Sequence, residues 1–489
     1  MSVAAHTNQL TSDQAAQLGQ LLDVFPAARE LGELFDAAGH ELYLVGGTVR
    51  DTLLAQGDPG DDVDLDFATS ARPEDTEALL RRFTAERGTV FLTGARFGTV
   101  SAVRDGDQIE ITTFRADEYE PGSRHPEVTF GDALEGDLAR RDFTVNAMAV
   151  RVPAFEFVDL FGGLSDLRNR VLRTPIDPHE SFGDDPLRML RLARFSAQLE
   201  AEPDEATFAA AQEMASQLAT ISAERIREEL CKLVLGASPR RGLVLLTDAG
   251  LAPWTLPELD ALRACVDPQH RHKDVWEHTL AVIENAMALE DRLPEGGPDL
   301  VLRLAALLHD IGKPATRRMH GDGTVTFHHH EMEGWRQTKD RMRELRFDKD
   351  TTRAVSELVK LHLRFHTYEL GWTDAAVRRY VRDAGDQLQR LNLLTRADVT
   401  TANARKERRI QRRVDELEER IEVLQEQEEL DAMRPPIDGR EIMDHLGIDP
   451  GPLVGQAWEF LLELRVEEGP MERDAALEAL DRWWAERDD

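Results

Sequence analysis

The sequence predicts an α+β protein that begins with a small head containing a mixed sheet and continues as a long all-α body. Two observations favour this division. Between residues 41 and 115, short segments alternate polar and apolar side chains with the period of two that is typical of strands. From about residue 184 onward this alternation nearly vanishes, and apolar residues recur at helical spacing.

The head is expected to begin with one amphipathic helix over 13–39, and a second helix begins after Gly47. The expected strands are 41–47, 62–68, 89–94, 98–104 and 108–115. Proline, glycine and charged residues interrupt 116–130, so we expect a mobile loop there.

The body is expected to consist of helices. Their predicted ranges are 185–217, 222–235, 275–291, 299–309, 351–363, 373–387 and 404–431. In the last range, apolar residues recur at spacings of 4, 3, 4 and 3, at Ile410, Val414, Leu417, Ile421 and Leu424. This heptad seam is short, so it favours a helical hairpin within one chain over a coiled coil between chains.

Composition limits the possible partners. The chain has 489 residues, 41% of them hydrophobic, which is enough for more than one packed domain. A net charge of -33 argues against indiscriminate binding to nucleic acid or anionic membranes, although it leaves room for a local basic track. Two cysteines suit a reducing compartment. We find no signal peptide and no apolar span, so we expect a cytoplasmic protein that does not enter a membrane.

Three carboxylates form the first candidate site. Asp64 and Asp66 lie two apart on an expected strand, so their side chains point to one face. Such carboxylates repel each other unless a cation lies between them, and oxygen ligands of this kind suit Mg²⁺. Glu110, on a neighbouring expected strand, could be the third ligand. The alternative is that all three are solvated strand residues.

A glycine pair precedes these carboxylates. Gly46 and Gly47 lie between an expected strand and an expected helix, where backbone N–H groups can approach a phosphate. Arg50 could reach the same anion with its guanidinium group. The alternative is a tight turn followed by a surface arginine.

A family resemblance now becomes visible. It rests on six segments in the family's order: LVGGTVRDTLL, DVDLDFATS, EITTFR, RRDFTVNAMAV, DLFGGLSDLRNRVLRT and DDPLRMLRLARF. Together they resemble the class II tRNA nucleotidyltransferases, which build the 3′-terminal CCA of tRNA; bacterial poly(A) polymerases share the head. The resemblance covers about residues 40–235 and continues more weakly to the end of the chain. It implies a polymerase-β-like nucleotidyltransferase head.

The resemblance also implies a reaction. Two Mg²⁺ ions held by Asp64, Asp66 and Glu110 would support transfer of nucleotides from CTP and ATP to the 3′ end of tRNA. In the segment RRDFTVNAM, Arg141 would contact the nucleotide phosphates and Asp142 would help to hold the ribose. The alternative is a buried Arg–Asp pair that braces the head.

A polar stripe on a helix is the candidate nucleotide selector. Asp185, Arg188, Arg191 and Arg194 follow each other at spacings of three. By resemblance, Asp185 and Arg188 read the Watson–Crick edge of the base, while Arg191 and Arg194 support that site or the phosphates. The family's usual Glu-Asp is Asp184–Asp185 here. The alternative is a helix cap followed by surface arginines.

A second set of metal ligands resembles the HD phosphohydrolases. By resemblance, its ligands are His278, His309, Asp310 and Asp398, with His330 and His362 placed for a second metal or for phosphate. Imidazole and carboxylate together suit Mn²⁺, Ni²⁺, Fe²⁺ or Mg²⁺. This domain could hydrolyse phosphoesters, or it could be a retained metal-binding fold that shapes the RNA track.

The RNA track is expected at a basic helix start. Its residues are Arg405, Lys406, Arg408, Arg409, Arg412 and Arg413. Arg240 and Arg241 are weaker candidates for the same role. Such contacts would read RNA by charge and shape. The alternative is a helix whose basic start is balanced by its acidic second half, without any ligand.

The favoured interpretation divides the chain into four domains. These are a catalytic head over 1–172, a nucleotide-selecting and RNA-binding helical neck over 173–237, an HD domain over 238–402, and a helical tail over 403–489 that contacts tRNA. No obligatory protein partner is evident. A poly(A) polymerase, or an enzyme that adds only CC or only A, stays open as an alternative. So does an HD phosphohydrolase whose head binds RNA without catalysis.

Overall fold

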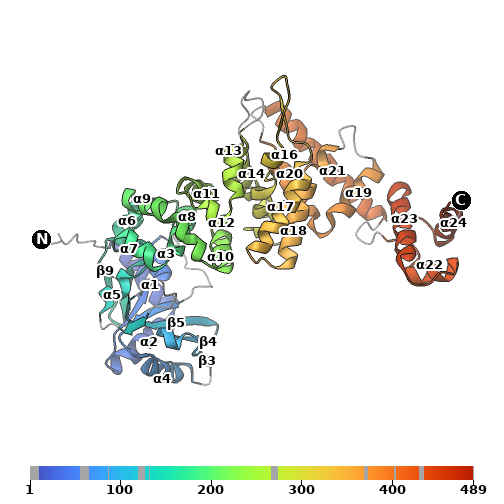
Figure 1. The fold of residues 1–489 in the computed structure, drawn as a ribbon. Coiled ribbons are helices and arrows are strands. Elements are labelled where there is room, and N and C mark those ends of the chain that lie inside the picture. The colour runs from blue at the N-terminus through green and yellow to red at the C-terminus, as the bar shows by residue number, and fades with distance from the viewer. Residues whose placement is uncertain are drawn as a thin grey trace. The chain divides into compact units, whose positions relative to one another are not determined.

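The computed structural model describes residues 10–54, 65–85, 87–118, 127–130, 133–265, 274–367, 373–400, 404–428 and 434–487. The chain forms two compact units, which divide between Thr255 and Leu256 (Figure 1). This division lies inside the range 238–402 that the sequence assigned to one domain, because α11 (Pro239–Asp248) packs on α8 (Leu187–Leu199) of the first unit.

The first unit contains a mixed seven-stranded sheet in the order β3-β4-β5-β2-β1-β8-β9. The strands are β1 (Leu42–Val45), β2 (Leu65–Thr69), β3 (Gly88–Phe91), β4 (Thr99–Arg104), β5 (Asp107–Thr113), β8 (Met148–Val152) and β9 (Glu156–Asp159). Within this sheet β2 and β5 run parallel, while the other neighbouring pairs are antiparallel. The expected mixed sheet is therefore confirmed.

Helices pack on this sheet. Helix α4 (Pro73–Thr84) contacts β3, β4 and β5, and α2 (Pro26–Ala37) contacts β1 and β8 (Figure 1). Side chains of β5 alternate accordingly, because Ile109 and Ile111 are buried whereas Glu110 is exposed. The glycine pair leads from β1 into α3 (Gly47–Leu54), as expected.

Two expectations for the head were wrong. The single helix over 13–39 is instead two helices, α1 (Ser12–Val24) and α2, which begins at Pro26 because proline suits the first turn of a helix better than its interior. The loop expected over 116–130 contains β6 (Arg115–Glu118) and β7 (Glu127–Phe130), which pair antiparallel. Backbone hydrogen bonds between these strands are not visible in a polar, charged sequence.

The neck is built around α8. Helix α5 (Leu134–Ala139) precedes β8 in the chain. The other elements after β9 are α6 (Gly163–Asn169), β10 (Val171–Leu172), α7 (Pro178–Asp184), β11 (Glu202–Pro203), α9 (Glu205–Met214), α10 (Ala223–Val234) and α12 (Ala252–Thr255). Both α10 and α11 pack on α8. The helical range expected over 185–217 is interrupted, because Glu200 has a φ of 51° and β11 then pairs with β10.

The second unit is mainly helical, as expected. Its first helices are α13 (Glu258–Ala264), α14 (Val275–Met287), α15 (Leu300–Leu308), α16 (Lys313–Thr316), α17 (His330–Glu344), α18 (Lys349–Leu361), α19 (Asp374–Ala384) and α20 (Leu388–Ala397). A short hairpin of β12 (Arg318–Met319) and β13 (Val325–Thr326) precedes α17.

The chain ends with α21 (Ala404–Glu428), α22 (Gly439–Leu446), α23 (Pro452–Glu468) and α24 (Arg473–Ala485). The heptad residues Val414, Leu417, Ile421 and Leu424 are buried, and α21 packs on α19 and α20 of the same chain. Helices α22, α23 and α24 share an apolar cluster of their own. Within the described ranges, no helix is both long and apolar enough to cross a membrane.

Candidate active site and metal cluster

Two of the three predicted carboxylates are direct neighbours. Asp66 on β2 and Glu110 on β5 are partners in the parallel register, so their side chains share one face of the sheet. Glu110 is exposed and Asp66 is half-buried. The Ser101 hydroxyl on β4 donates to Glu110 Oε1 at 3.4 Å. Asp64 lies outside the described residues.

The glycine turn adjoins this pair. Gly46 has a φ of 75°, a conformation that favours glycine, and a Cβ atom there would lie 3.1 Å from Arg141 Nη1 and 3.8 Å from Asp66 Oδ2. The absence of a side chain at Gly46 thus leaves room for the Arg141 guanidinium beside Asp66. Gly46, Asp66 and Arg141, which belong to three separate sequence segments, therefore lie together at this point.

A chain of polar contacts links the turn to α8. Arg50 Nη1 donates to Asn146 Oδ1 at 2.7 Å, and Asn146 Nδ2 donates to Asp142 Oδ1 at 2.9 Å. Asp142 Oδ2 lies 2.5 Å from Arg191 Nη2. Arg50 also forms a bidentate ion pair with Asp51. Because Arg50 is buried, the alternative that it is a surface arginine does not hold.

The buried Asp142 is held as a carboxylate. Burial alone would raise its pKa, but Arg191, Asn146 and the backbone N–H of Phe143 together hold the pKa below its usual value. The structure therefore contains a buried Arg–Asp pair that braces the head, although the partner of Asp142 is Arg191 rather than Arg141.

Sequence reasoning missed two residues at this site. Asp137 is fully buried and pairs with Arg140 at 2.6 Å and Arg141 at 3.3 Å, so it orients the arginine beside Gly46. Its spacing of three and four residues from these arginines was an available signal. The second residue is Phe195, whose ring lies 5.1 Å from the Arg50 guanidinium and 3.9 Å from that of Arg194. A phenylalanine in an apolar helix face gives no such signal.

The selector residues already have partners in the structure. Asp185 precedes α8, accepts from the backbone N–H of Leu187 at 3.2 Å, and accepts from Arg225 Nη2 at 2.8 Å. Arg188 is buried and donates to the carbonyl and hydroxyl oxygens of Ser181 at 3.0 and 2.8 Å.

Two further contacts fix α8 on both sides. Arg188 Nη2 donates to the Arg140 carbonyl oxygen at 2.5 Å, which ties the helix to the segment before Asp142. Arg194 is buried and pairs with Glu229 of α10 at 2.5 Å. Arg188 thus connects α8 to the head, and Arg194 connects α8 to α10 of the neck.

The second unit brings the predicted HD ligands together. The Nε2 atom of His278 lies 3.1 Å from His309 Nε2, 3.3 Å from Asp310 Oδ2 and 3.0 Å from Asp398 Oδ1. On the other side, Asp310 Oδ1 lies 3.2 Å from His330 Nε2 and 3.9 Å from His362 Nε2. Asp310 therefore faces two groups of metal-ligand type, one through each oxygen.

Every imidazole of this cluster is oriented by its other nitrogen. The Nδ1 atoms of His309, His330 and His362 lie 2.7–2.8 Å from the carbonyl oxygens of Ala306, Phe327 and Val359 respectively. His278 Nδ1 lies 2.7 Å from the Thr400 hydroxyl. Donation from Nδ1–H to a carbonyl leaves an Nε2 lone pair available, which is the usual arrangement around a protein-bound metal.

Charge in the cluster is negative at its centre. Burial would raise the pKa of Asp310, but His309, Lys313 and His278 hold it well below its usual value. Lys313 Nζ lies 2.5 Å from Asp310 Oδ2, a contact that was not predicted from the sequence. The four imidazoles and two carboxylates fit a divalent transition-metal ion better than a structural Zn²⁺ site, which is usually built with thiolates.

The basic start of α21 is partly exposed. Arg405, Arg408, Arg409 and Arg412 are exposed, whereas the Arg413 guanidinium lies 5.2 Å from the Phe365 ring. The side chain of Lys406 lies outside the described residues.

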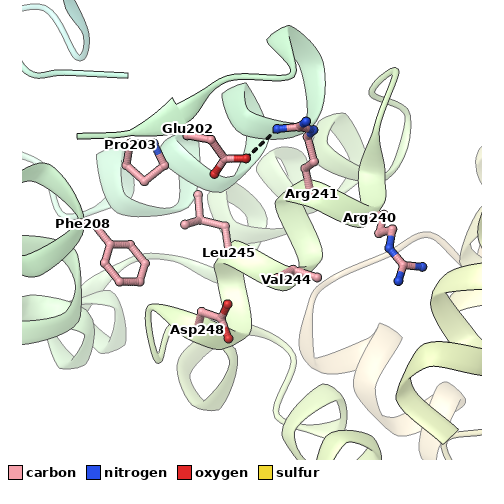
Figure 2. Close-up of a pocket in the computed structure, with 8 residues that line it drawn as sticks. All are labelled: Glu202, Pro203, Phe208, Arg240, Arg241, Val244, Leu245 and Asp248. Carbon is pink, nitrogen blue, oxygen red and sulfur yellow. Dashed lines mark hydrogen bonds and ion pairs between the residues drawn. The ribbon is translucent and has the colours of Figure 1, made fainter. Parts of the chain in front are cut away.

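A pocket of about 470 Å³ lies between β11, α9 and α11. Figure 2 shows the ion pair between Arg241 and Glu202, whose Nη1 and Oε1 atoms lie 2.5 Å apart. Leu245, Phe208 and Asp248 also line this pocket. The weaker RNA-contact candidates Arg240 and Arg241 therefore line a pocket with both apolar and charged residues.

Comparison with family models agrees with the two sites. Residues 42–173 match the poly A polymerase head domain, and 202–263 match the probable RNA and SrmB-binding site of polymerase A. Residues 275–403 match the HD domain. The chain therefore contains segments that match a poly A polymerase head, a polymerase RNA-binding region and an HD domain, in this order. The match places the turn at Gly46, the Asp66–Glu110 pair and the Asp142 brace within the polymerase head, and the second cluster within the HD domain.

Several curated relatives of this chain are named CCA-adding enzymes. The chain is 41% identical over 237 residues to the CCA-adding enzyme of Levilactobacillus brevis, which covers 48% of this chain and 56% of that protein. It is 43% identical over 219 residues to that of Enterococcus faecalis, covering 45% and 50%. The matched segment thus spans about half the length of these relatives.

Solved structures of CCA-adding enzymes share the fold. The enzyme of Bacillus stearothermophilus in complex with CTP matches with a TM-score of 0.62 and 23% identity, over 95% of this chain and 98% of that one. The enzyme of Thermotoga maritima complexed with tRNA matches with a TM-score of 0.57 and 18% identity, over 97% and 99%.

Proposed function

We propose that this protein is a CCA tRNA nucleotidyltransferase, which adds C, C and A to tRNA 3′ ends from CTP and ATP. The observation that carries the proposal is the pairing of Asp66 with Glu110 on an accessible face, directly beside the Gly46 turn and Arg141. Relatives named CCA-adding enzymes support the choice of product over a poly(A) tail or a partial tail.

The catalytic metal ligands are Asp64, Asp66 and Glu110. Two carboxylates side by side on adjacent strands fit a divalent cation, since without one they repel each other. Bound Mg²⁺ would neutralise charge on the phosphates and lower the pKa of the RNA 3′-hydroxyl. Arg141, oriented by Asp137, holds the nucleotide phosphates at the turn of Gly46 and Gly47. The backbone N–H groups of this turn add further donors.

The other head residues position these groups. Arg50 keeps the start of α3 fixed through Asn146, and Asp142 receives the ribose while Arg191 keeps the carboxylate charged. The reaction therefore depends on positioning and charge neutralisation, without a covalent intermediate.

Base choice is assigned to Asp185 and Arg188, with Arg191 and Arg194 as support. Because Asp185 contacts Arg225 and Arg188 contacts Ser181, recognition of a base exchanges these contacts for contacts to the Watson–Crick edge. Arg188→Ala should therefore raise misincorporation more than it raises the KM for CTP. Equal fidelity in Arg188→Ala and the wild type would contradict this role.

The first experiment uses a tRNA transcript that lacks its last three nucleotides. The protein is incubated with Mg²⁺, CTP and ATP, and the 3′ ends are sequenced. Addition of C, C and A and then arrest is the expected result. A long A tail or a partial tail would replace the proposal with a poly(A) polymerase or a partial enzyme, and no tail would reject transferase activity.

The HD cluster is proposed as a second, metal-dependent site that hydrolyses phosphoesters. Convergence of His278, His309, Asp310 and Asp398 supports one metal, and His330 with His362 supports a second one that shares Asp310. Mn²⁺, Ni²⁺, Fe²⁺ and Mg²⁺ are the candidate ions. Lys313 would neutralise charge beside the reacting phosphate.

Hydrolysis can be separated from nucleotide addition by two variants. Opening of a 2′,3′-cyclic phosphate on RNA to a terminal monophosphate, or release of inorganic phosphate from a terminal phosphate, should survive Asp66→Ala and disappear in Asp310→Ala. Absence of turnover with each candidate metal would favour the alternative, a metal-binding fold that shapes the RNA track.

We place the tRNA contacts on the basic start of α21, at Arg405, Lys406, Arg408, Arg409, Arg412 and Arg413. The exposure of four of these arginines supports this assignment. The head over 1–172, the neck over 173–237, the HD domain over 238–402 and the tail over 403–489 are the proposed functional domains. A cytoplasmic location would follow from action on tRNA.

A further inference from the structure

One row of side chains crosses four strands of the head. Asp66 pairs with Glu110, Glu110 pairs with Ser101 of β4, and Ser101 pairs with Phe91 of β3. Residues paired across neighbouring strands point to the same face of a sheet. Phe91 therefore lies on the face of the candidate metal ligands, two strand spacings or roughly 10 Å from Glu110.

Phe91 is unusual for its position. Phe91 is 46% exposed, while Val100 and Ala102, which flank Ser101 along β4, are buried on the opposite face. The apolar ring is thus presented to solvent beside two carboxylates and a hydroxyl group. Burial of this ring against another flat group would be favourable, because the exposed apolar surface would leave water.

The direction of the reaction suggests which group covers it. In the sheet order, the phosphate-binding turn at Gly46 follows β1, on one side of the β2–β5 carboxylates, and β4 and β3 lie on the other side. In-line transfer places the attacking oxygen opposite the leaving pyrophosphate. If the phosphates lie at Gly46 and Arg141, the RNA 3′ end must approach over β4 and β3.

We propose that the face of β4 and β3 carrying Ser101 and Phe91 is the docking surface for the RNA 3′ end, and that the Phe91 ring stacks on one of its unpaired bases. This inference rests on the proposed nucleotidyl transfer. Stacking on an aromatic ring suits an enzyme whose primer end changes during addition, because every base offers a π-face. Ser101, which donates to Glu110, lies between the ring and the carboxylates.

The test compares Phe91→Ala with Leu92→Ala in the full chain. Leu92 is the matched control, since it is the adjacent residue and is similarly exposed, at 41%. We expect Phe91→Ala to raise the KM for tRNA lacking CCA by about 5- to 150-fold, the range of one lost stacking contact. The KM for CTP should stay within about twofold of the wild-type value, because CTP binds at the Gly46 turn and Arg141 on the other side of the carboxylates. Phe91→Trp should restore the wild-type KM for tRNA.

A second measurement does not need catalysis. tRNA carrying 4-thiouridine at its 3′ end is crosslinked to the wild-type protein by light, and the modified peptide is mapped. A crosslink within 88–104 that disappears in Phe91→Ala would support the inference, even if the wild type added no nucleotide and the proposed activity failed. Normal CCA addition with an unchanged KM in Phe91→Ala, or an equal loss in Leu92→Ala, would overturn the inference and leave the proposed function intact.

Discussion

Asp66 and Glu110 face each other across the parallel pair of β2 and β5, although 43 residues separate them in the chain. Such a carboxylate pair is stable at neutral pH when a cation lies between its members. We expect Glu110→Gln to reduce nucleotide addition by about 10³-fold, since one ligand charge of the reaction centre is lost. The rate is measured by incorporation of labelled CTP over a Mg²⁺ titration. Gln108→Ala, on the same strand, is the control and should retain the wild-type rate.

Gly46 offers a test that separates backbone strain from crowding. Gly46→Ala should destabilise the protein by about 1–2 kcal/mol because of its positive φ, and it should also raise the KM for CTP because the new Cβ displaces Arg141. Gly39 has a φ of 82°, and no atom lies within 4 Å of an added Cβ. Gly39→Ala therefore measures the effect of backbone strain without crowding. Thermal unfolding and steady-state kinetics of both variants give the answer. A similar rise in KM in both variants would show that crowding at Arg141 has no role.

The Asp142–Arg191 pair predicts a pH-dependent stability. Arg191→Ala should cost about 3 kcal/mol at pH 7, the lower end of the range for a buried pair, because one third of the Arg191 side chain is exposed. The pKa of Asp142 is lowered in the folded protein, so the pair stabilises above the unfolded pKa and this contribution is lost as the pH falls through the folded pKa.

The difference in stability between Arg191→Ala and the wild type should therefore shrink below about pH 4. Urea unfolding at several pH values measures it. Arg225→Ala, which removes the half-exposed pair with Asp185, should cost no more than about 1 kcal/mol and serves as the reference. A constant difference from pH 7 to pH 3 would contradict the assignment of charge to Asp142.

The HD cluster makes a prediction about metal content. Asp310→Ala should lose both ions, because each of its carboxylate oxygens faces a different group of histidines. His362→Ala should lose one ion and keep the other. Elemental analysis after dialysis against Mn²⁺ or Ni²⁺ measures the occupancy. His320→Ala, in the β12–β13 hairpin, is the histidine control and should keep the wild-type content. Equal metal content in Asp310→Ala and His362→Ala would argue against a shared carboxylate.

The basic start of α21 predicts a salt dependence. Replacing Arg408, Arg409 and Arg412 by glutamine should weaken tRNA binding and lower the slope of log Kd against log salt by up to about 3, roughly one for each lost phosphate contact. Filter binding between 50 and 200 mM salt measures the slope. Replacement of the exposed Arg81 and Arg82 on α4 by glutamine is the control and should leave the slope unchanged. An unchanged slope would favour the alternative that this helix binds no ligand.

The sequence predicted the carboxylate pair well, because a period of two fixes the face of Asp66 and Glu110 once their strands are neighbours. The resemblance to HD phosphohydrolases also predicted that His278, His309, Asp310 and Asp398 would lie together, and the structure brings these side chains together. Prediction from the sequence failed at the hairpin of β6 and β7, because β6 is polar and charged and β7 alternates polar and apolar residues over only four positions.

Contacts between residues far apart in the sequence could not be predicted either. Nothing in the spacing of the α8 arginines indicated that Arg191 would pair with Asp142 or Arg194 with Glu229, because any of the four polar side chains could face any neighbour. Pro26 and Asp137, in contrast, carry local signals: proline favours the first turn of a helix, and Asp137 lies three and four residues from two arginines.

The contacts of Arg188 have a consequence for attempts to change the nucleotide preference of the proposed transferase. The residue assigned to base reading also clamps the carbonyl groups of Ser181 and Arg140, and so it joins the recognition helix to the head. A replacement chosen for a new base would remove this clamp as well. Altered specificity at this position should therefore come with a looser head, and variants that keep both properties will need a compensating donor elsewhere on α8.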